Sequence, residues 1–202
     1  MNADPESRSR HLSWKLSSKL AVTYLWQGNK NETIIQLQVS DLEISTWYGR
    51  KAPTNGQPDL GQVKEPFLLV LSDKEAEIYS TCKDENALNF QRGLASLFIY
   101  KQENGDFNEA DVMGQCRSSY SQDHHGLHKV RENCAPLPDA DQSLFSNRHY
   151  ATVKSLYKIL DDGIISQIEV REWLELYPHL TPEMGQDVQQ RQTLILRGKF
   201  DI

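Results

Sequence analysis

Residues 84–98 read DENALNFQRGLASLF, and this stretch decides the fold. Its apolar residues recur at helical spacing, at positions 87, 90, 94 and 97 or 98, and Asp84 stands where a helix N-cap is expected. Leu88 and Ala95 widen the apolar surface beyond one stripe, and a helix of this kind is usually enclosed by other elements. The residues expected to fill the core from this helix are Phe90, Leu94, Leu97 and Phe98.

Strand-forming sequence lies on both sides of the predicted helix. Apolar residues alternate from residue 16 to 26, and again from 35 to 44, with a change of parity after Val39 that indicates a β-bulge. Further alternating runs follow residue 110. Two of them flank Asp162-Gly163, which is a strong signal for a hairpin turn.

The sequence therefore predicts a mainly β fold, an antiparallel β-barrel of about nine or ten strands wrapped around one central α-helix. The helix is expected over about residues 84–98 and the domain over residues 14–202. Residues 1–13 are polar and are expected to be disordered. No internal repeat or low-complexity segment divides the domain.

Composition disfavours several classes of function. The 202 residues carry 22 Lys and Arg against 28 Asp and Glu, a formal net charge of −6, which disfavours general binding to nucleic acid and to acidic membranes. Mean hydropathy is −0.61, and no apolar run approaches the roughly 20 residues of a membrane-spanning helix. Residues 1–6 show no basic stretch followed by an apolar core, so no signal peptide is recognised in this sequence.

No residue constellation predicts catalysis, a metal site or a cofactor. Residues 123–128, DHHGLH, fall at a predicted hairpin tip, where side chains diverge, and are interpreted as a solvated turn rather than a metal site. Residues 104–111, NGDFNEAD, are similar in composition to a calcium loop. They lack a glycine at the sixth loop position counted from Asp106, so they are interpreted as an acidic connecting loop. We expect a protein that is not an enzyme and that holds no cofactor and no metal.

Three cysteines, Cys82, Cys116 and Cys134, bear on the cellular compartment. A hairpin centred near His125 places Cys116 opposite Cys134, within disulfide reach. The alternative is that both thiols are reduced and are symmetric about the turn without bonding. We favour the disulfide, which would contribute about 3 kcal/mol and would imply an oxidising compartment.

Two runs of sequence resemble a known family. Residues 91–98, QRGLASLF, and residues 108–116, NEADVMGQC, followed by Tyr120 and Cys134, resemble the N-terminal module of large lipid transfer proteins. That family includes the vitellogenins, apolipoprotein B and the microsomal triglyceride transfer proteins, and the two runs are most similar to the last branch. The resemblance covers residues 14–134 by motif and residues 135–202 by strand pattern only.

The resemblance implies lipid transport. In this family the module is a β-barrel that closes on a central helix. The triglyceride transfer branch loads lipoproteins in the endoplasmic reticulum as a heterodimer with protein disulfide isomerase. The resemblance therefore implies an N-terminal domain that acts in lipoprotein assembly by docking an apolipoprotein B-like lipoprotein. Neutral lipid and phospholipid would be held only by further domains downstream.

Two alternatives stay open. The same fold would serve a vitellogenin-like nutrient or lipid-carrier domain, and a small β-barrel could instead hold one apolar ligand as a lipid carrier. The resemblance implies the lumen of the endoplasmic reticulum, with secretion as the alternative. In the secretory pathway the sequon Asn31-Glu32-Thr33 would make Asn31 a candidate for N-glycosylation.

Overall fold

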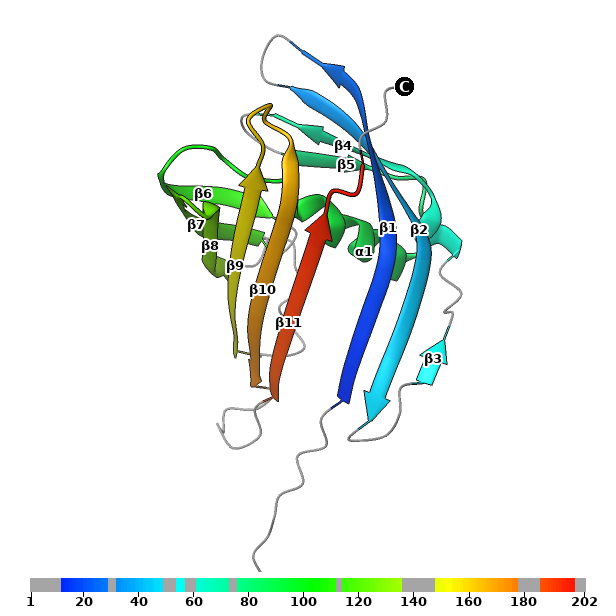
Figure 1. Ribbon diagram of the computed structural model, residues 1–202. Helices are drawn as coiled ribbons and strands as arrows, with labels where there is room; N and C mark the ends of the chain where they lie inside the picture. Colours follow the sequence, from blue (N-terminus) through cyan, green and yellow to red (C-terminus); the bar gives the residue numbers. More distant parts are fainter. Residues whose placement is uncertain are drawn as a thin grey trace, which may run out of the picture. The chain divides into compact units, whose positions relative to one another are not determined.

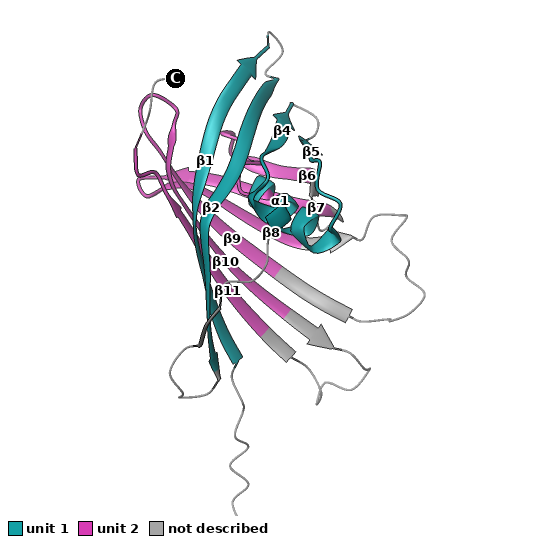
Figure 2. Ribbon diagram, turned by 90° about the vertical axis from the view of Figure 1, so that its right-hand side faces the viewer, with its two compact units in different colours: residues 1–95 teal, residues 96–202 magenta. Residues whose placement is uncertain are grey.

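The computed structural model describes residues 12–28, 32–48, 54–56, 61–72, 76–111, 114–135, 148–177 and 186–198. The chain divides into two compact units, residues 1–95 and residues 96–202 (Figure 2). Each unit is built on one antiparallel sheet. Along the chain, the α-helix follows the strands of the first sheet and precedes those of the second (Figure 1). The predicted mainly β fold with an α-helix in mid-sequence is therefore confirmed for the described residues.

The first unit holds a five-stranded sheet in the order β1-β2-β4-β5, with β3 also paired to β2. Its strands are β1 (Leu12–Gln27), β2 (Thr33–Tyr48), β3 (Thr54–Gly56), β4 (Phe67–Leu71) and β5 (Ala76–Tyr79). A short 3-10 helix, η1 (Gly61–Lys64), precedes β4, and the α-helix, α1 (Glu85–Ser96), follows β5.

The β1–β2 pair contains the bulge that the sequence predicted. The register shifts between Ser17 and Lys19 on β1, and Asp41 on the facing part of β2 adopts a φ of 50°. Val39 and Leu42 differ in sequence parity, yet both are buried. The bulge explains this, because an irregular register is what allows residues of different parity to reach the same face.

The predicted helix is confirmed as α1, and Asp84 is its N-cap. The Asp84 carboxylate accepts a hydrogen bond from the Ala87 N–H at 2.8 Å, and the Asp84 carbonyl accepts one from the Leu88 N–H at 2.9 Å. The helix contributes to a buried cluster, here called the α1 cluster, of Val39, Leu42, Val63 and Ala87. The helix therefore belongs to the core of the first unit.

The second unit holds a six-stranded sheet in the order β11-β10-β9-β8-β7-β6, so that spatial neighbours are also sequence neighbours. Its strands are β6 (Gly105–Asp111), β7 (Gly114–Asp123), β8 (Gly126–Ala135), β9 (Arg148–Ile159), β10 (Ile165–Tyr177) and β11 (Gln186–Ile195). At the β9–β10 turn Gly163 adopts a φ of 80°, and its N–H donates to the Leu160 carbonyl at 2.8 Å. The hairpin predicted at Asp162-Gly163 is confirmed.

Two predictions differ from the structure. The described strands form two separate sheets with eleven strands, rather than nine or ten, and their pairing does not confirm a closed barrel. The segment interpreted as an acidic loop is instead strand β6. Its acidic residues concealed the alternation, because Glu109 is buried in spite of its charge. Residues 1–11 lie outside the described residues, so disorder there stays a prediction, and β1 begins at Leu12.

Candidate functional site

The four apolar residues predicted to fill the core from the helix differ in burial. Phe90 and Leu94 are half-buried and pack against the α1 cluster. Leu97 is buried and Phe98 is half-buried, but both lie just after the end of α1. The positions buried within α1 itself are Ala87, Gln91 and Ala95. Asn86, Asn89 and Arg92 are exposed, so the helix buries one face rather than most of its circumference.

Gln91 is a buried polar residue that the sequence analysis did not single out. Its side chain accepts a hydrogen bond from Ser80 Oγ at 2.6 Å and donates to the Glu65 carbonyl at 3.4 Å. Close by, Gln62 Oε1 accepts a hydrogen bond from the Asp84 N–H at 3.0 Å. Because a buried amide is unfavourable without partners, these bonds fix the path that leads from β5 into α1.

The structure describes the side chains of Cys82 and Cys116. Cys116 is buried on β7 and disulfide-bonded, whereas Cys82 is a half-buried free thiol. The β7–β8 register shifts across Cys116, which places it opposite residues 133–134 of β8. The pairing of Cys116 with Cys134 stays a prediction, because the side chain of Cys134 lies outside the described residues.

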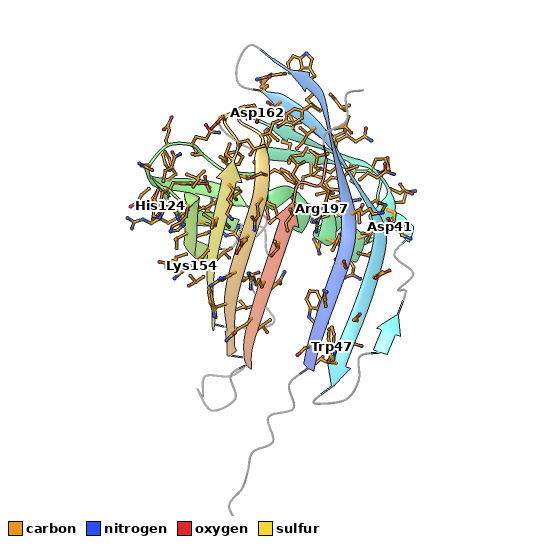
Figure 3. The ribbon with its side chains drawn as sticks, viewed as in Figure 1. Asp41, Trp47, His124, Lys154, Asp162 and Arg197 are labelled. Atoms are coloured by element: carbon orange, nitrogen blue, oxygen red, sulfur yellow. The ribbon has the colours of Figure 1, made fainter. Side chains whose placement is uncertain are left out.

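The histidine-rich segment forms the turn between β7 and β8, as the sequence predicted, and His124 marks it in Figure 3. The Asp123 carboxylate accepts a hydrogen bond from the His125 N–H at 2.8 Å and lies 3.1 Å from His128 Nε2. Among the described residues no group of three His, Cys, Asp or Glu side chains could hold a metal ion. Asn31, the predicted glycosylation site, lies outside those residues.

Three buried polar side chains lie on adjacent strands of the second unit, Glu109 on β6, Tyr120 on β7 and Lys129 on β8. The Tyr120 hydroxyl donates to Glu109 Oε1 at 2.7 Å, and Lys129 Nζ lies 2.8 Å from Glu109 Oε2. Lys129 also donates to the Ile99 carbonyl at 2.9 Å. We call these three side chains the inner polar cluster.

Burial and pairing oppose each other in the inner polar cluster. Burial raises the pKa of Glu109, but the Lys129 ammonium and the hydrogen bonds from Lys129 and Tyr120 outweigh it, so the pKa lies below its ordinary value. Burial lowers the pKa of Lys129, and the Glu109 carboxylate offsets only part of that shift. Burial and the bond to Glu109 raise the pKa of Tyr120. The cluster is therefore an ion pair beside a neutral phenol.

The signal for this cluster is present in the sequence but is weak. Strand alternation from buried Leu127 places Lys129 on the same face, and the β7–β8 register sets Lys129 opposite Tyr120. A lysine on a core face could have been recognised as a residue that needs a buried partner. Which carboxylate would pair with it depends on the pairing of β6 with β7, which the interpretation of 104–111 as a loop excluded.

Strand β1 carries an apolar surface. Six of its large apolar residues are 40% exposed or more: Leu12, Trp14, Val22, Tyr24, Leu25 and Trp26. They fall into two groups, one at each end of the strand. Because β1 ends the hydrogen-bonded order of its sheet, both groups lie on an edge strand. Apolar side chains gathered in this way are typical of an interaction surface.

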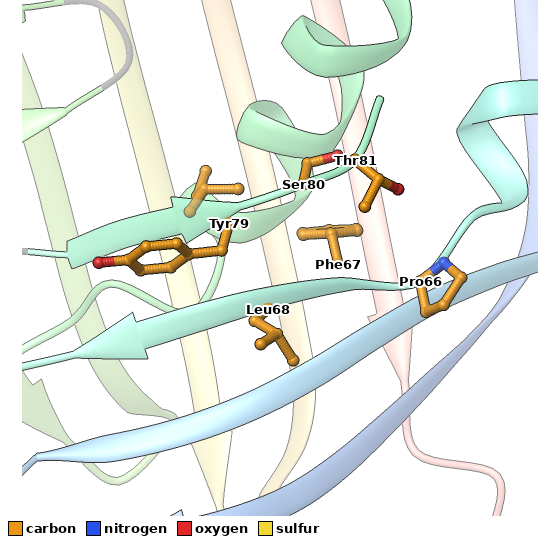
Figure 4. A pocket seen from close by; sticks show the side chains of 7 residues that line it. Pro66, Phe67, Leu68, Tyr79, Ser80 and Thr81 are labelled. Atoms are coloured by element: carbon orange, nitrogen blue, oxygen red, sulfur yellow. The ribbon is translucent and has the colours of Figure 1, made fainter. Parts of the chain in front are cut away.

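An open groove of about 400 Å³ lies along β4 and β5 (Figure 4). Its lining residues are Pro66, Phe67, Leu68, Ile78, Tyr79, Ser80 and Thr81. The hydroxyls of Ser80 and Thr81 already donate to Gln91 and Glu65. No described helix is long and apolar enough to span a membrane.

The chain is similar in sequence to microsomal triglyceride transfer proteins. It is 26% identical to the large subunit from Sus scrofa over 179 residues, which covers 77% of this chain and 20% of that protein. It is 27% identical to the Homo sapiens large subunit over 175 residues, with the same coverage. It is 24% identical to the Drosophila melanogaster microsomal triacylglycerol transfer protein over 200 residues, covering 95% of this chain and 21% of that protein.

The chain spans about a fifth of the length of these relatives. No protein-family model matches it. Its fold matches a solved structure of lipovitellin, described in terms of lipid–protein interactions, with a TM-score of 0.64 at 18% identity. That match covers 95% of this chain and 24% of the lipovitellin chain. The similarity along most of the sequence, together with the shared fold, supports a vitellogenin-type lipid transfer N-terminal domain.

Proposed function

We propose that the chain is a lipid transport domain that acts in lipoprotein assembly by docking an apolipoprotein B-like lipoprotein, without catalysis. The similarity to proteins named for triglyceride or triacylglycerol transfer extends over most of the chain and supports this assignment. Since the chain spans about a fifth of those relatives, the holding of neutral lipid and phospholipid is assigned to other parts of such a protein.

The observation that carries the docking role is the location of the apolar surface. The largest fully buried side chains include Phe67, Leu37 and Tyr157. The buried face of the second sheet also holds the ion pair of Glu109 and Lys129, which is an unfavourable neighbour for an apolar ligand. Exposed apolar residues lie on β1 instead, where a partner could reach them.

The proposal extends to compartment and architecture. The disulfide at Cys116 suits an oxidising compartment, which supports the lumen of the endoplasmic reticulum, with secretion as the alternative. Protein disulfide isomerase is retained as a second partner, since the resemblance implies it. We also propose that the strands close into a barrel around α1, in which β1, the terminal strand of the first sheet, would pair along its open edge.

The test mixes the purified chain with an N-terminal fragment of an apolipoprotein B-like lipoprotein in the absence of lipid. Docking predicts that the two proteins co-purify. A parallel titration with a fluorescent phospholipid, and with a fluorescent triglyceride, is expected to show no saturable one-to-one uptake. Saturable uptake without co-purification would favour the small lipid carrier and would overturn docking.

A vitellogenin-like nutrient or lipid-carrier domain is the second candidate, and the lipovitellin fold favours it. It would share the exposed β1 surface but would have no selective affinity for an apolipoprotein B-like fragment. Binding of the chain to the apolipoprotein B-like fragment is compared with its binding to an unrelated lipoprotein fragment of equal size. Only the docking role predicts that the chain prefers the apolipoprotein B-like fragment.

A further inference from the structure

Three consecutive apolar residues are exposed where β1 approaches its turn. Tyr24, Leu25 and Trp26, here called the β1 tip, are 71%, 50% and 52% exposed. Neighbouring side chains of a regular strand alternate between faces. Here the register shifts between Tyr24 and Trp26, so that Leu25 is the extra residue of a bulge. The irregularity gathers the three side chains at one end of an edge strand.

Trp26 is held in position by the chain itself. The space beside Gly28 is occupied by the indole, since a Cβ added at Gly28 would lie 2.2 Å from Trp26 Cη2. The Gly28 N–H donates to the Glu32 carbonyl at 2.8 Å and closes the base of the turn. One side of the indole therefore contacts the backbone, while about half of the side chain stays exposed.

The chemistry of the β1 tip suits a lipid layer. Tyrosine and tryptophan have an apolar body and a polar O–H or N–H, and they are enriched where hydrocarbon meets the headgroups. Residues 20–29 carry no charged side chain and lie between Lys19 and Lys30, so the three apolar side chains themselves bring no charge into the lipid.

The β1 tip by itself is too small for a standard protein interface, so docking of a protein would need further surface. A fully buried aromatic side chain contributes roughly 150–250 Å². Three half-exposed side chains therefore offer well below the roughly 800 Å² that each partner buries in such an interface. Insertion into a fluid layer requires no matching surface, so a small apolar tip is sufficient for weak, reversible attachment.

We propose that the β1 tip binds the surface of a phospholipid layer, with Leu25 at the acyl boundary and Tyr24 and Trp26 at the level of the headgroups. The inference deepens the proposed function and rests on it, because a lipid transport domain has to meet a lipid surface. It assigns that contact to three residues at one end of β1.

The test is flotation of the 202-residue chain with phosphatidylcholine vesicles. The tip variant carries Tyr24→Ser, Leu25→Ser and Trp26→Ser. The matched control carries Val188→Ser and Ile195→Ser, which lie on β11 and are 42% and 46% exposed. The floated fraction should fall roughly tenfold for the tip variant and stay within about twofold for the control. Equal losses, or no loss in the tip variant, would overturn the inference.

A second measurement does not depend on the folding of the tip variant. It uses two variants that each keep a single tryptophan. One keeps Trp26 and the other keeps Trp14, and in each the remaining three tryptophans are replaced by Phe. Brominated phosphatidylcholine vesicles should quench Trp26 and leave Trp14 unquenched, and equal quenching would count against the proposal. A chain that binds the apolipoprotein B-like fragment but no vesicles overturns this inference alone. A chain that binds vesicles but not the fragment overturns docking alone.

Discussion

Lys129 on β8 reaches Glu109 on β6 across the intervening strand β7, with Nζ 2.8 Å from Oε2. The two side chains are only 5% and 7% exposed. Tyr120, on β7, donates to the other carboxylate oxygen of Glu109 and completes the link between the three strands. Because each charge is buried, loss of one partner leaves the other without compensation.

Lys129→Met is expected to destabilise the chain by about 3–5 kcal/mol at pH 7. In the wild type the pKa of Glu109 is lowered, so its contribution is present above the unfolded-state pKa and is lost as pH falls through the folded-state pKa. In the variant, burial without the ammonium would raise the pKa of Glu109 above about 4.3. The loss should therefore shrink as pH falls towards that value, which urea unfolding across this pH range measures.

Two further variants control this experiment. Glu109→Gln combined with Lys129→Met removes both charges and should recover part of the lost stability. Arg117→Gln breaks an exposed pair with Asp106, whose side chains are 67% and 52% exposed, and should change stability little because water screens the pair. If Lys129→Met cost no more than Arg117→Gln, the structural role of the cluster would be wrong.

Peptide mapping under non-reducing conditions should recover a fragment that links Cys116 to Cys134. Cys116→Ser with Cys134→Ser should then lower the free energy of unfolding by about 3 kcal/mol, because the unfolded chain regains the entropy of the open loop. Cys82→Ser is the control, since Cys82 is a free thiol. Recovery of Cys116 and Cys134 as free thiols from oxidised protein would contradict the pairing.

Leu94→Asp should unfold the first unit or destabilise it by several kcal/mol, because Leu94 packs against the α1 cluster and an unpaired carboxylate there is unfavourable. Asn89→Asp places the same charge on an exposed position of α1 and should change little. Thermal melting followed by circular dichroism measures both variants. A Leu94→Asp chain that melts like the parent would show that α1 is not part of the core.

Two glycines should respond in opposite directions to alanine. Gly126 adopts a φ of 139°, and an added Cβ would lie 2.3 Å from the Tyr157 carbonyl oxygen, so Gly126→Ala should cost about 1–3 kcal/mol. Gly93 lies within α1, and an added Cβ would have no neighbour within 4 Å, so Gly93→Ala should stabilise by about 0.5–1 kcal/mol. Chemical denaturation measures both, and a loss of stability in Gly93→Ala would contradict the open environment.

Local signals predicted most elements of the fold. The Asp84 cap, the Asp162-Gly163 turn and the parity change after Val39 each depend on a few adjacent residues, and all three are found in the structure. These features could be predicted from the sequence because helix capping, turn geometry and strand alternation each depend on residues that are close together along the chain.

Features that depend on long-range pairing were missed. Residues 104–111 are predicted to be an acidic connecting loop, whereas they form β6, and the pairing of Glu109 with Lys129 two strands away accounts for a buried carboxylate there. Alternation along residues 16–26 predicts a strand, but it does not predict that Trp14 and Trp26 are more than half exposed. Alternation identifies a strand, but its neighbours decide how much of each face is covered.

The most direct test of the central claim is an equilibrium binding curve between the chain and an immobilised N-terminal fragment of an apolipoprotein B-like lipoprotein, without lipid. The docking account predicts saturable one-to-one binding that exceeds binding to an unrelated fragment of the same size. Absence of saturable binding by a chain that is folded, as judged by its melting transition, would contradict it.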